Sequence, residues 1–101
     1  MDELTSAQRK QLRSLAHHLR PICYIGKSGL TDSVRVSVDV ALEAHELVKV
    51  KFVDRKDEKK ELTAQVAEQT ESQIAGIIGH VAILYRQHRD PEKRTIELRD
   101  A

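Results

Sequence analysis

The segment at positions 26–29 carries the residue types best suited to binding a phosphate. Its sequence is Gly-Lys-Ser-Gly, and Gly-Lys-Ser is also how the phosphate-binding loop of many ATPases ends. That loop requires another glycine five positions before Gly26, where this chain has Pro21. Proline has no backbone N–H to offer a phosphate, and Gly29 stands where the ATPase pattern already leads into a helix. The spacing therefore argues against ATP binding through these residues.

The same four residues make better physical sense as a Gly-x-x-Gly turn between a strand and a helix. Two glycines allow backbone angles that other residues avoid and let another backbone approach closely. The helix start that follows offers unpaired amides to a phosphate, while Lys27 adds a mobile charge and Ser28 a small donor. KH modules hold the backbone of RNA with such a loop. The pattern alone is weakly specific, because tight turns favour glycine and Gly76 and Gly79 frame the same pattern elsewhere.

Residues for catalysis or metal binding are scarce. Cys23 lies in an apolar run, where we expect a buried small side chain and not a nucleophile. His17 and His18 are adjacent and would point about 100° apart on a helix, so they cannot chelate one metal ion together. His45 ends an apolar helix face, where a partly buried imidazole is the usual outcome. We therefore expect no enzyme, and no metal, cofactor or small-molecule substrate.

Helical periodicity predicts a first helix over 5–19. Thr5 and Gln8 have the spacing of a capping box, and Pro21 forbids continuation. Its apolar residues recur on one face, namely Leu12, Leu15, Ala16 and Leu19.

The segment over 30–45 shows two conflicting periodicities. Residues 34–40 alternate apolar and polar side chains and contain four valines, which favours a strand. Helical geometry, however, leaves only Val36 and Val40 off the apolar stripe, and Thr31 with Asp32 supplies capping chemistry. The length of the segment is ordinary for a helix, so we interpret it as one. The stripe consists of Leu30, Val34, Val38, Ala41, Leu42 and His45.

The other patterns predict strands over 22–25, 47–53, 74–78 and 81–86 and a helix over 58–70. Gly79 and His80 suit a hairpin turn, and residues 95–98 allow a short edge strand in the charged tail over 88–101. The order α-β-α-β-α-β-β predicts a single α/β domain over 1–101, with an open mixed sheet of about four strands and helices packed on it. The aromatic residues fall on strands, where we expect them mostly in the core: Tyr24, Phe52 and Tyr85.

Composition and charge narrow the class of protein. The chain has 101 residues, of which 40% are hydrophobic and 33% charged, and a single cysteine, which excludes disordered, collagen-like and disulfide-framed proteins. No apolar run suits a membrane span and the first residues are acidic and polar, so we expect a cytoplasmic protein. Residues 1–29 carry five Lys or Arg against two acids, within a net charge of only +1. This basic third suits either a nucleic-acid partner or a solvated helix face.

Four ordered motifs resemble the CRM domain, specifically its stand-alone bacterial YhbY-like form. The first is Leu-Ala-His-His-Leu-Arg-Pro at 15–21, and the second is Ile-Gly-Lys-Ser-Gly-Leu-Thr-Asp at 25–32. The third runs over 41–51, and the last is Ile-Gly-His-Val-Ala-Ile-Leu-Tyr-Arg at 78–86. The resemblance covers about 4–87, which we take as the core of the domain.

The resemblance implies a fold similar to the C-terminal domain of translation initiation factor three, with a helix over 31–45. It also implies RNA binding, associated in bacteria with precursors of the large ribosomal subunit. The family's loop maps onto Gly26, Lys27, Ser28 and Gly29. The basic first helix supplies further candidates that the family motif does not fix individually, namely Arg9, Lys10, Arg13 and Arg20.

The leading hypothesis is thus an RNA-binding accessory factor for ribosome assembly that acts by docking on ribosomal RNA or a large-subunit precursor. The main alternative is a protein-interaction adaptor on an assembling ribosome with little direct RNA contact. The near-neutral net charge and the off-stripe Val36 and Val40 favour this alternative, because two neighbouring valines can form an apolar contact surface.

Overall fold

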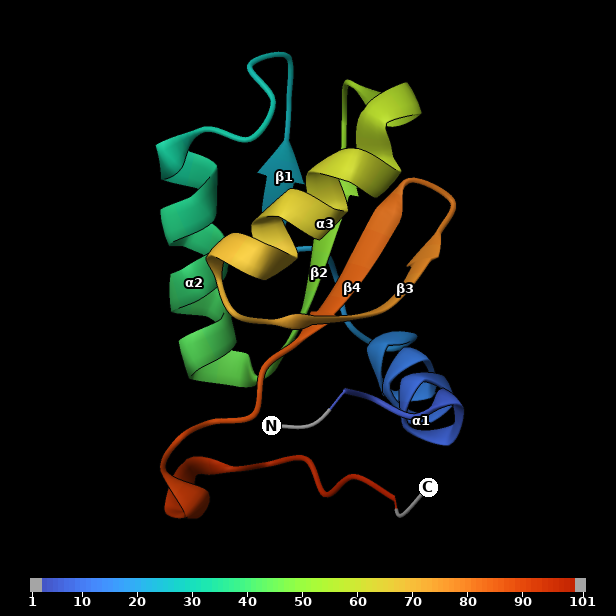
Figure 1. The fold of residues 1–101 in the computed structure, drawn as a ribbon, viewed down its shortest axis with the longest axis vertical. Coiled ribbons are helices and arrows are strands. Elements are labelled where there is room, and N and C mark those ends of the chain that lie inside the picture. The colour runs from blue at the N-terminus through green and yellow to red at the C-terminus, as the bar shows by residue number, and fades with distance from the viewer. Residues whose placement is uncertain (1–2, 100–101) are drawn as a thin grey trace.

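A four-stranded sheet organises residues 3–99, the part of the chain that the computed structural model describes. The elements are α1 (Ser6–Ala16), β1 (Cys23–Ile25), α2 (Asp32–His45), β2 (Leu47–Phe52), α3 (Lys59–Gln69), β3 (Gln73–Ile78) and β4 (Val81–Tyr85), with short 3-10 helices at Lys56–Glu58 and Pro91–Lys93. The strands lie in the order β1-β2-β4-β3 (Figure 1). β1 is parallel to β2, and the other neighbours are antiparallel. The predicted element order and the mixed open sheet are confirmed.

Helix α1 begins as predicted and ends earlier. The Thr5 hydroxyl accepts a hydrogen bond from the Gln8 amide at 3.1 Å, and the Gln8 side chain accepts one from the Thr5 amide at 3.0 Å, which completes the capping box. The last helical residue is Ala16 and not Leu19. Pro21 has no N–H to continue the hydrogen-bond ladder, so the chain leaves the helix a turn before it to reach β1.

The buried face of α1 is correspondingly narrower than predicted. Leu12 and Ala16 are buried, whereas Leu15 and Leu19 are 44% and 42% exposed. The early end of the helix takes Leu19 off its surface altogether.

The segment with conflicting periodicities forms helix α2, as predicted. The Thr31 hydroxyl caps it by accepting a hydrogen bond from the Val34 amide at 3.2 Å. Val36 and Val40 lie off the buried stripe and are 48% and 62% exposed. The residues that the helix buries all belong to the predicted stripe: Val38, Ala41 and Leu42.

The two faces of the sheet are covered unequally (Figure 1). Helices α2 and α3 pack on one face, over a core that includes Ile25, Val50 and Phe52. Helix α1 packs on the opposite face, over Leu47 and Ile83. Helix α1 lies across one end of that face and leaves the other end open (Figure 1).

The predicted burial is wrong for two residues, Tyr24 and His45. Phe52 and Tyr85 lie in the core as predicted, but Tyr24 is 53% exposed. Successive side chains of a strand point to opposite faces, and Tyr24 points to the face that α1 leaves open. His45 is exposed, not partly buried, because α2 ends there and the chain turns away through Glu46.

A glycine in β3 lies directly under a side chain of α1. A Cβ atom at Gly76 would lie 2.7 Å from Cδ of Arg13, so a larger residue would displace that side chain from its present place. Nη1 of Arg13 reaches past it and donates to the carbonyl of Ala75 at 2.9 Å, where the strand register is irregular. Arg13 therefore ties α1 to the bulged part of β3.

The C-terminal segment forms no strand at 95–98, which corrects the predicted edge strand. The amides of His88, Thr95 and Ile96 instead donate to the buried carboxylate of Glu46, at 2.7, 2.7 and 3.3 Å. Gln11 of α1 adds a contact to the carbonyl of Glu97 at 2.8 Å. Because these amides already have a hydrogen-bond acceptor in the Glu46 side chain, they do not require pairing with a strand.

Glu46 is held in its ionised form by these contacts. Burial acts most strongly on this carboxyl and alone would raise its pKa. The hydrogen bonds from His88, Thr95 and Ile96 together outweigh burial, so the pKa of Glu46 lies below its ordinary value of 4.5.

Candidate nucleic-acid interface

The Gly-Lys-Ser-Gly loop forms a tight turn between β1 and α2. The amide of Gly29 donates to the carbonyl of Gly26 at 3.0 Å, which places exposed Lys27 and Ser28 at the tip. Gly29 has φ +70°, a conformation that side-chain-bearing residues rarely adopt. The loop therefore presents Lys27 on a fixed backbone.

Arg55 supports this loop from the end of β2, and the sequence patterns missed it. Its Nε donates to the carbonyl of Lys27 at 2.7 Å, and a Cβ atom at Gly29 would lie 3.3 Å from its side chain. Glu58 holds the guanidinium in turn, through an ion pair of 3.1 Å. Only the sheet topology could have identified Arg55 as a neighbour of the loop. Because β1 and β2 are parallel neighbours, the residues that follow them meet at one edge of the sheet.

The start of α2 contributes less to anion binding than a helix N-terminus usually does. The Thr31 hydroxyl already takes the amide of Val34, and Asp32 places a carboxylate in the first turn. That carboxylate partly neutralises the positive end of the helix dipole, so less of its field remains to attract a phosphate. Attraction for a phosphate at this loop must therefore come from Lys27 and nearby basic side chains.

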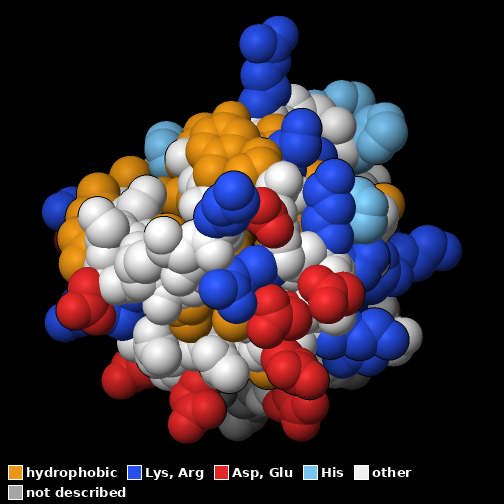
Figure 2. Space-filling view, turned by 90° about the horizontal axis from the view of Figure 1, so that it is seen from above, with side chains coloured by type: hydrophobic (Ala, Val, Ile, Leu, Met, Phe, Trp, Pro, Cys, Tyr) orange, Lys and Arg blue, Asp and Glu red, His pale blue; other side chains and the backbone are white. Residues whose placement is uncertain are grey.

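Further basic residues surround the hairpin turn at the same edge of the sheet. Nζ of Lys59 donates to the carbonyl of Gly79 at 2.6 Å. His80, in that turn, has a pKa below its ordinary value, through some desolvation and then through the charges of Lys59 and Lys56. Figure 2 looks onto this end of the molecule and shows Lys and Arg side chains around a group of hydrophobic ones, with acidic side chains gathered along the lower edge.

The hydrophobic side chains next to the loop belong to the uncovered end of the sheet. Tyr24 pairs with Lys51, Lys51 with Val81, and Val81 with Ile78, so one row crosses all four strands on the same face. This row and its neighbours towards α1 form a surface that we call the "open sheet face". The row consists of Tyr24, Lys51, Val81 and Ile78, and the neighbours are Ile22 and Lys49.

The structure separates the basic residues predicted on the first helix from the loop. Figure 1 shows the loop at one end of the molecule and α1 at the other. Arg9 donates to the carbonyl of Leu4 at 2.7 Å, and Arg13 is bound to β3, so both have structural contacts. Lys10 and Arg20 are exposed. Arg20 lies in the connection between α1 and β1, beside Ile22 and Lys49 of the open sheet face.

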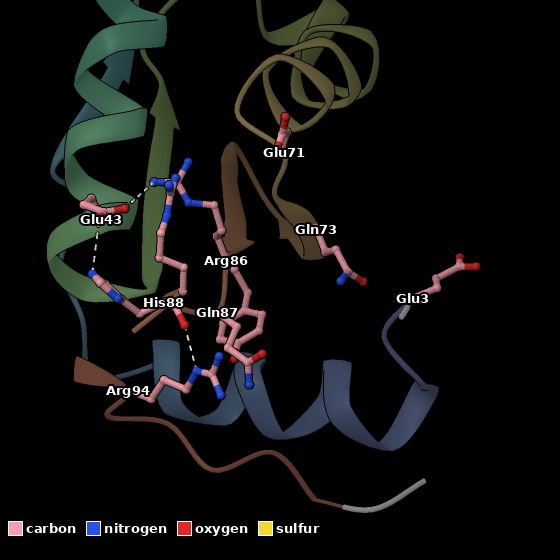
Figure 3. Close-up of a pocket in the computed structure, with 10 residues that line it drawn as sticks. Glu3, Glu43, Glu71, Gln73, Arg86, Gln87, His88 and Arg94 are labelled. Atoms are coloured by element: carbon pink, nitrogen blue, oxygen red, sulfur yellow. Dashed lines mark hydrogen bonds and ion pairs between the residues drawn. The ribbon is translucent and has the colours of Figure 1, made fainter. Parts of the chain in front are cut away.

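A second concave surface lies near the C-terminal segment. A cavity of about 900 Å³ is lined by residues from β4, the end of α2 and the C-terminal segment (Figure 3). Arg86 bonds to Asp39 at 2.6 Å and to Glu43 at 3.3 Å, and Nε of Arg94 donates to the carbonyl of His88 at 2.7 Å. The charges here mostly satisfy one another, which indicates a structural junction.

The described part of the chain contains neither a cluster of metal ligands nor a membrane-spanning helix. Within residues 3–99, no group of three or more His, Cys, Asp or Glu side chains is placed to hold a metal ion. Over the same residues, every helix is too short or too polar to cross a bilayer.

The fold and the loop define the class of protein, and comparison with known families agrees. The model of the CRS1/YhbY (CRM) domain matches residues 4–86, and the chain belongs to this family. The resemblance drawn from the four sequence motifs is thereby confirmed.

Named relatives extend over most of the chain. It is 36% identical over 91 residues to a Pseudomonas aeruginosa protein named "Probable RNA-binding protein PA4753", covering 89% of this chain and 88% of that one. It is 36% identical over 96 residues to "Probable RNA-binding protein YqeI" of Bacillus subtilis, covering 94% and 98%. The solution structure of the Staphylococcus aureus protein SAV1595 superposes with a TM-score of 0.78 at 36% identity, covering 93% of this chain and 99% of that one.

Proposed function

We propose that this protein binds RNA through the Gly-Lys-Ser-Gly loop and acts as an accessory factor in ribosome assembly. The observation that carries the proposal is the loop itself: Lys27 stands exposed at the tip of a turn that Gly29 and Arg55 hold in place. A preformed turn loses little conformational freedom when it closes on a phosphate. The names of the relatives support RNA as the partner.

The proposed ligand is ribosomal RNA or a precursor of the large subunit, in the cytoplasm. This role follows from the family resemblance and involves docking, not chemistry. Lys27 and the loop amides would contact the phosphate backbone, and Arg20 and Lys10 would add exposed charge. In this proposal Arg9 and Arg13 act indirectly, by holding α1 in place.

The test is fluorescence-anisotropy titration of structured ribosomal-RNA fragments and matched duplex DNA. We expect RNA to be preferred and Lys27→Ala to weaken binding, with an unchanged thermal unfolding curve because Lys27 is exposed. Lys93→Ala, at an exposed site in the C-terminal 3-10 helix, is the matched control.

A second variant tests the shape of the loop and not its charge. Gly29→Val forces a β-branched residue into φ +70° against the Arg55 side chain and should weaken RNA binding further. RNA binding equal to that of the parent in both Lys27→Ala and Gly29→Val would refute the loop assignment.

One observation keeps the adaptor function as a second candidate. Val36 and Val40 are 48% and 62% exposed on α2, one helical turn apart, and so offer an apolar contact to a ribosomal or assembly protein. A pull-down partner that persists after nuclease treatment and in high salt, and disappears in Val40→Lys, would favour this function.

A further inference from the structure

We propose that the open sheet face receives unpaired nucleotides of the RNA, with one base stacked on Tyr24. This inference rests on the RNA-binding function proposed above. It deepens that function by naming the kind of RNA, a single-stranded segment, and by adding a second contact surface next to the loop.

Strand register places the relevant side chains in one line. Tyr24 on β1 is 53% exposed and Ile78 on β3 is 59% exposed, and between them the row contains Lys51 and Val81. An aromatic ring at one edge, an aliphatic side chain at the other and a lysine between them combine stacking, apolar contact and positive charge. Single-stranded nucleic acids bind surfaces with this combination.

Tyr24 is held in a position suited to stacking. Its hydroxyl donates to the carbonyl of Pro21 at 3.1 Å, which restrains the ring along the surface of the sheet. A restrained ring loses little entropy when a base stacks on it. About half of the side chain remains in contact with water and is therefore accessible to a base.

The open sheet face continues directly into the loop that contains Lys27. Tyr24 and Gly26 are two residues apart at the end of β1, and Val53, 52% exposed, lies within 3.8 Å of the position of a Cβ atom at Gly26. One strand of RNA can thus place a phosphate at the loop and the bases next to it on Tyr24. Duplex RNA fits this surface poorly, because its bases are stacked on one another and offer only their edges, not an open ring face, to Tyr24.

Helix α1 limits how far the bound strand extends. Towards α1, the row that contains Ile22 and Lys49 ends at Ile83, which α1 buries, and at Gly76, which the Arg13 side chain covers. Nζ of Lys49 is bound to the carbonyl of Leu19 at 3.0 Å, which leaves Lys51 as the lysine of this face without a partner in the described protein. The surface therefore accommodates a few nucleotides.

The experiment compares a short single-stranded RNA carrying 2-aminopurine with the same sequence annealed to its complement. For the single strand, Tyr24→Ala should weaken binding roughly 5- to 150-fold, the range of base–aromatic stacking measured by alanine substitution. Tyr24→Phe keeps the ring and should stay within about twofold of the parent. Quenching of 2-aminopurine on binding should persist in Tyr24→Phe and vanish in Tyr24→Ala.

A second variant tests the same surface even if Tyr24→Ala destabilises the protein. Ile78→Glu places a negative charge on an exposed position of the same row and should weaken single-strand binding without unfolding the protein. Unfolding curves of all variants serve as the control.

The outcomes separate this inference from the function on which it rests. If RNA binding is lost in Lys27→Ala but unchanged in folded Tyr24→Ala and in Ile78→Glu, the function stands and the inference is wrong. Equal losses for single strand and duplex in Tyr24→Ala also overturn it, since they indicate a purely structural role. If the parent protein binds neither form of RNA, both proposals fail.

Discussion

At the scale of single residues, basic side chains of similar appearance in the sequence have different roles. Arg13 is bound to a strand carbonyl and fills the space over Gly76, whereas Lys10, three residues earlier on the same helix, is exposed. Lys27 is exposed too, but it stands on a turn whose backbone is fixed. Charge alone therefore does not identify which of these residues is available to a ligand.

This difference gives a prediction for stability. Arg13→Ala should lower the free energy of unfolding by about 1–2 kcal/mol, because it removes a partly buried hydrogen bond to Ala75 and leaves a gap over Gly76. Lys10→Ala should change it by less than about 0.5 kcal/mol. Denaturant titration measures both, and equal effects would contradict the structural role of Arg13.

At the scale of elements, one buried carboxylate collects several of the backbone hydrogen bonds that hold the C-terminal segment to the domain. Glu46 directly follows α2 and accepts backbone hydrogen bonds from residues 42–50 positions away in the chain. Ile96 and Leu98 then pack against the core under α1. The charged tail is thereby a part of the fold without belonging to the sheet.

Acid should weaken this attachment. The pKa of Glu46 is lower in the folded protein than its ordinary value of 4.5. Its contribution to stability is therefore complete above about pH 5 and is lost as the pH falls below 4.5 through the lower, folded value. Glu46→Gln removes the charge and should cost about 2 kcal/mol at pH 7, since hydrogen bonds to charged groups are the stronger ones.

The measurement is the free energy of unfolding of parent and Glu46→Gln between pH 3 and pH 7. The difference between them should shrink towards the acid end. A difference that stays constant over this range would show that the carboxylate charge does not hold the segment.

At the scale of the whole molecule, the distribution of charge matters more than its sum. The net charge is +1, yet Figure 2 shows Lys and Arg side chains around a hydrophobic group and acidic side chains gathered along the lower edge. A protein with such an uneven distribution of charge is oriented by the field of a polyanion even when its net charge is small. The open sheet face shares the end of the molecule that bears the loop.

Salt dependence should distinguish the two proposed contacts. Plotted as log affinity against log salt for single-stranded RNA, the slope of Lys27→Ala should be less steep than that of the parent by about 0.7, the value of one phosphate contact. Tyr24→Ala should lower the affinity at every salt concentration and leave the slope unchanged, because stacking releases no counterions. Parallel lines for Lys27→Ala and the parent would argue against a phosphate contact by Lys27.

The local sequence determined much of this architecture. Capping residues, periodicity and turn glycines act over a few positions, and they predicted the element order, the capping box at Thr5 and the tight turn at 26–29. The segment 30–45 needed more, because four valines suit a strand as well as a helix; the family resemblance favoured the helix that α2 forms.

Only the tertiary structure decided which residues share a surface. The exposure of Tyr24 depends on α1 packing over only one end of its face of the sheet. The contact of Arg55 with the loop depends on β1 and β2 lying side by side. The distance between α1 and the loop, and the path of the tail over Glu46, likewise follow from packing between segments far apart in the chain. Spacing along a sequence reports neighbours within a turn or a strand, whereas a binding surface is assembled from several elements at once.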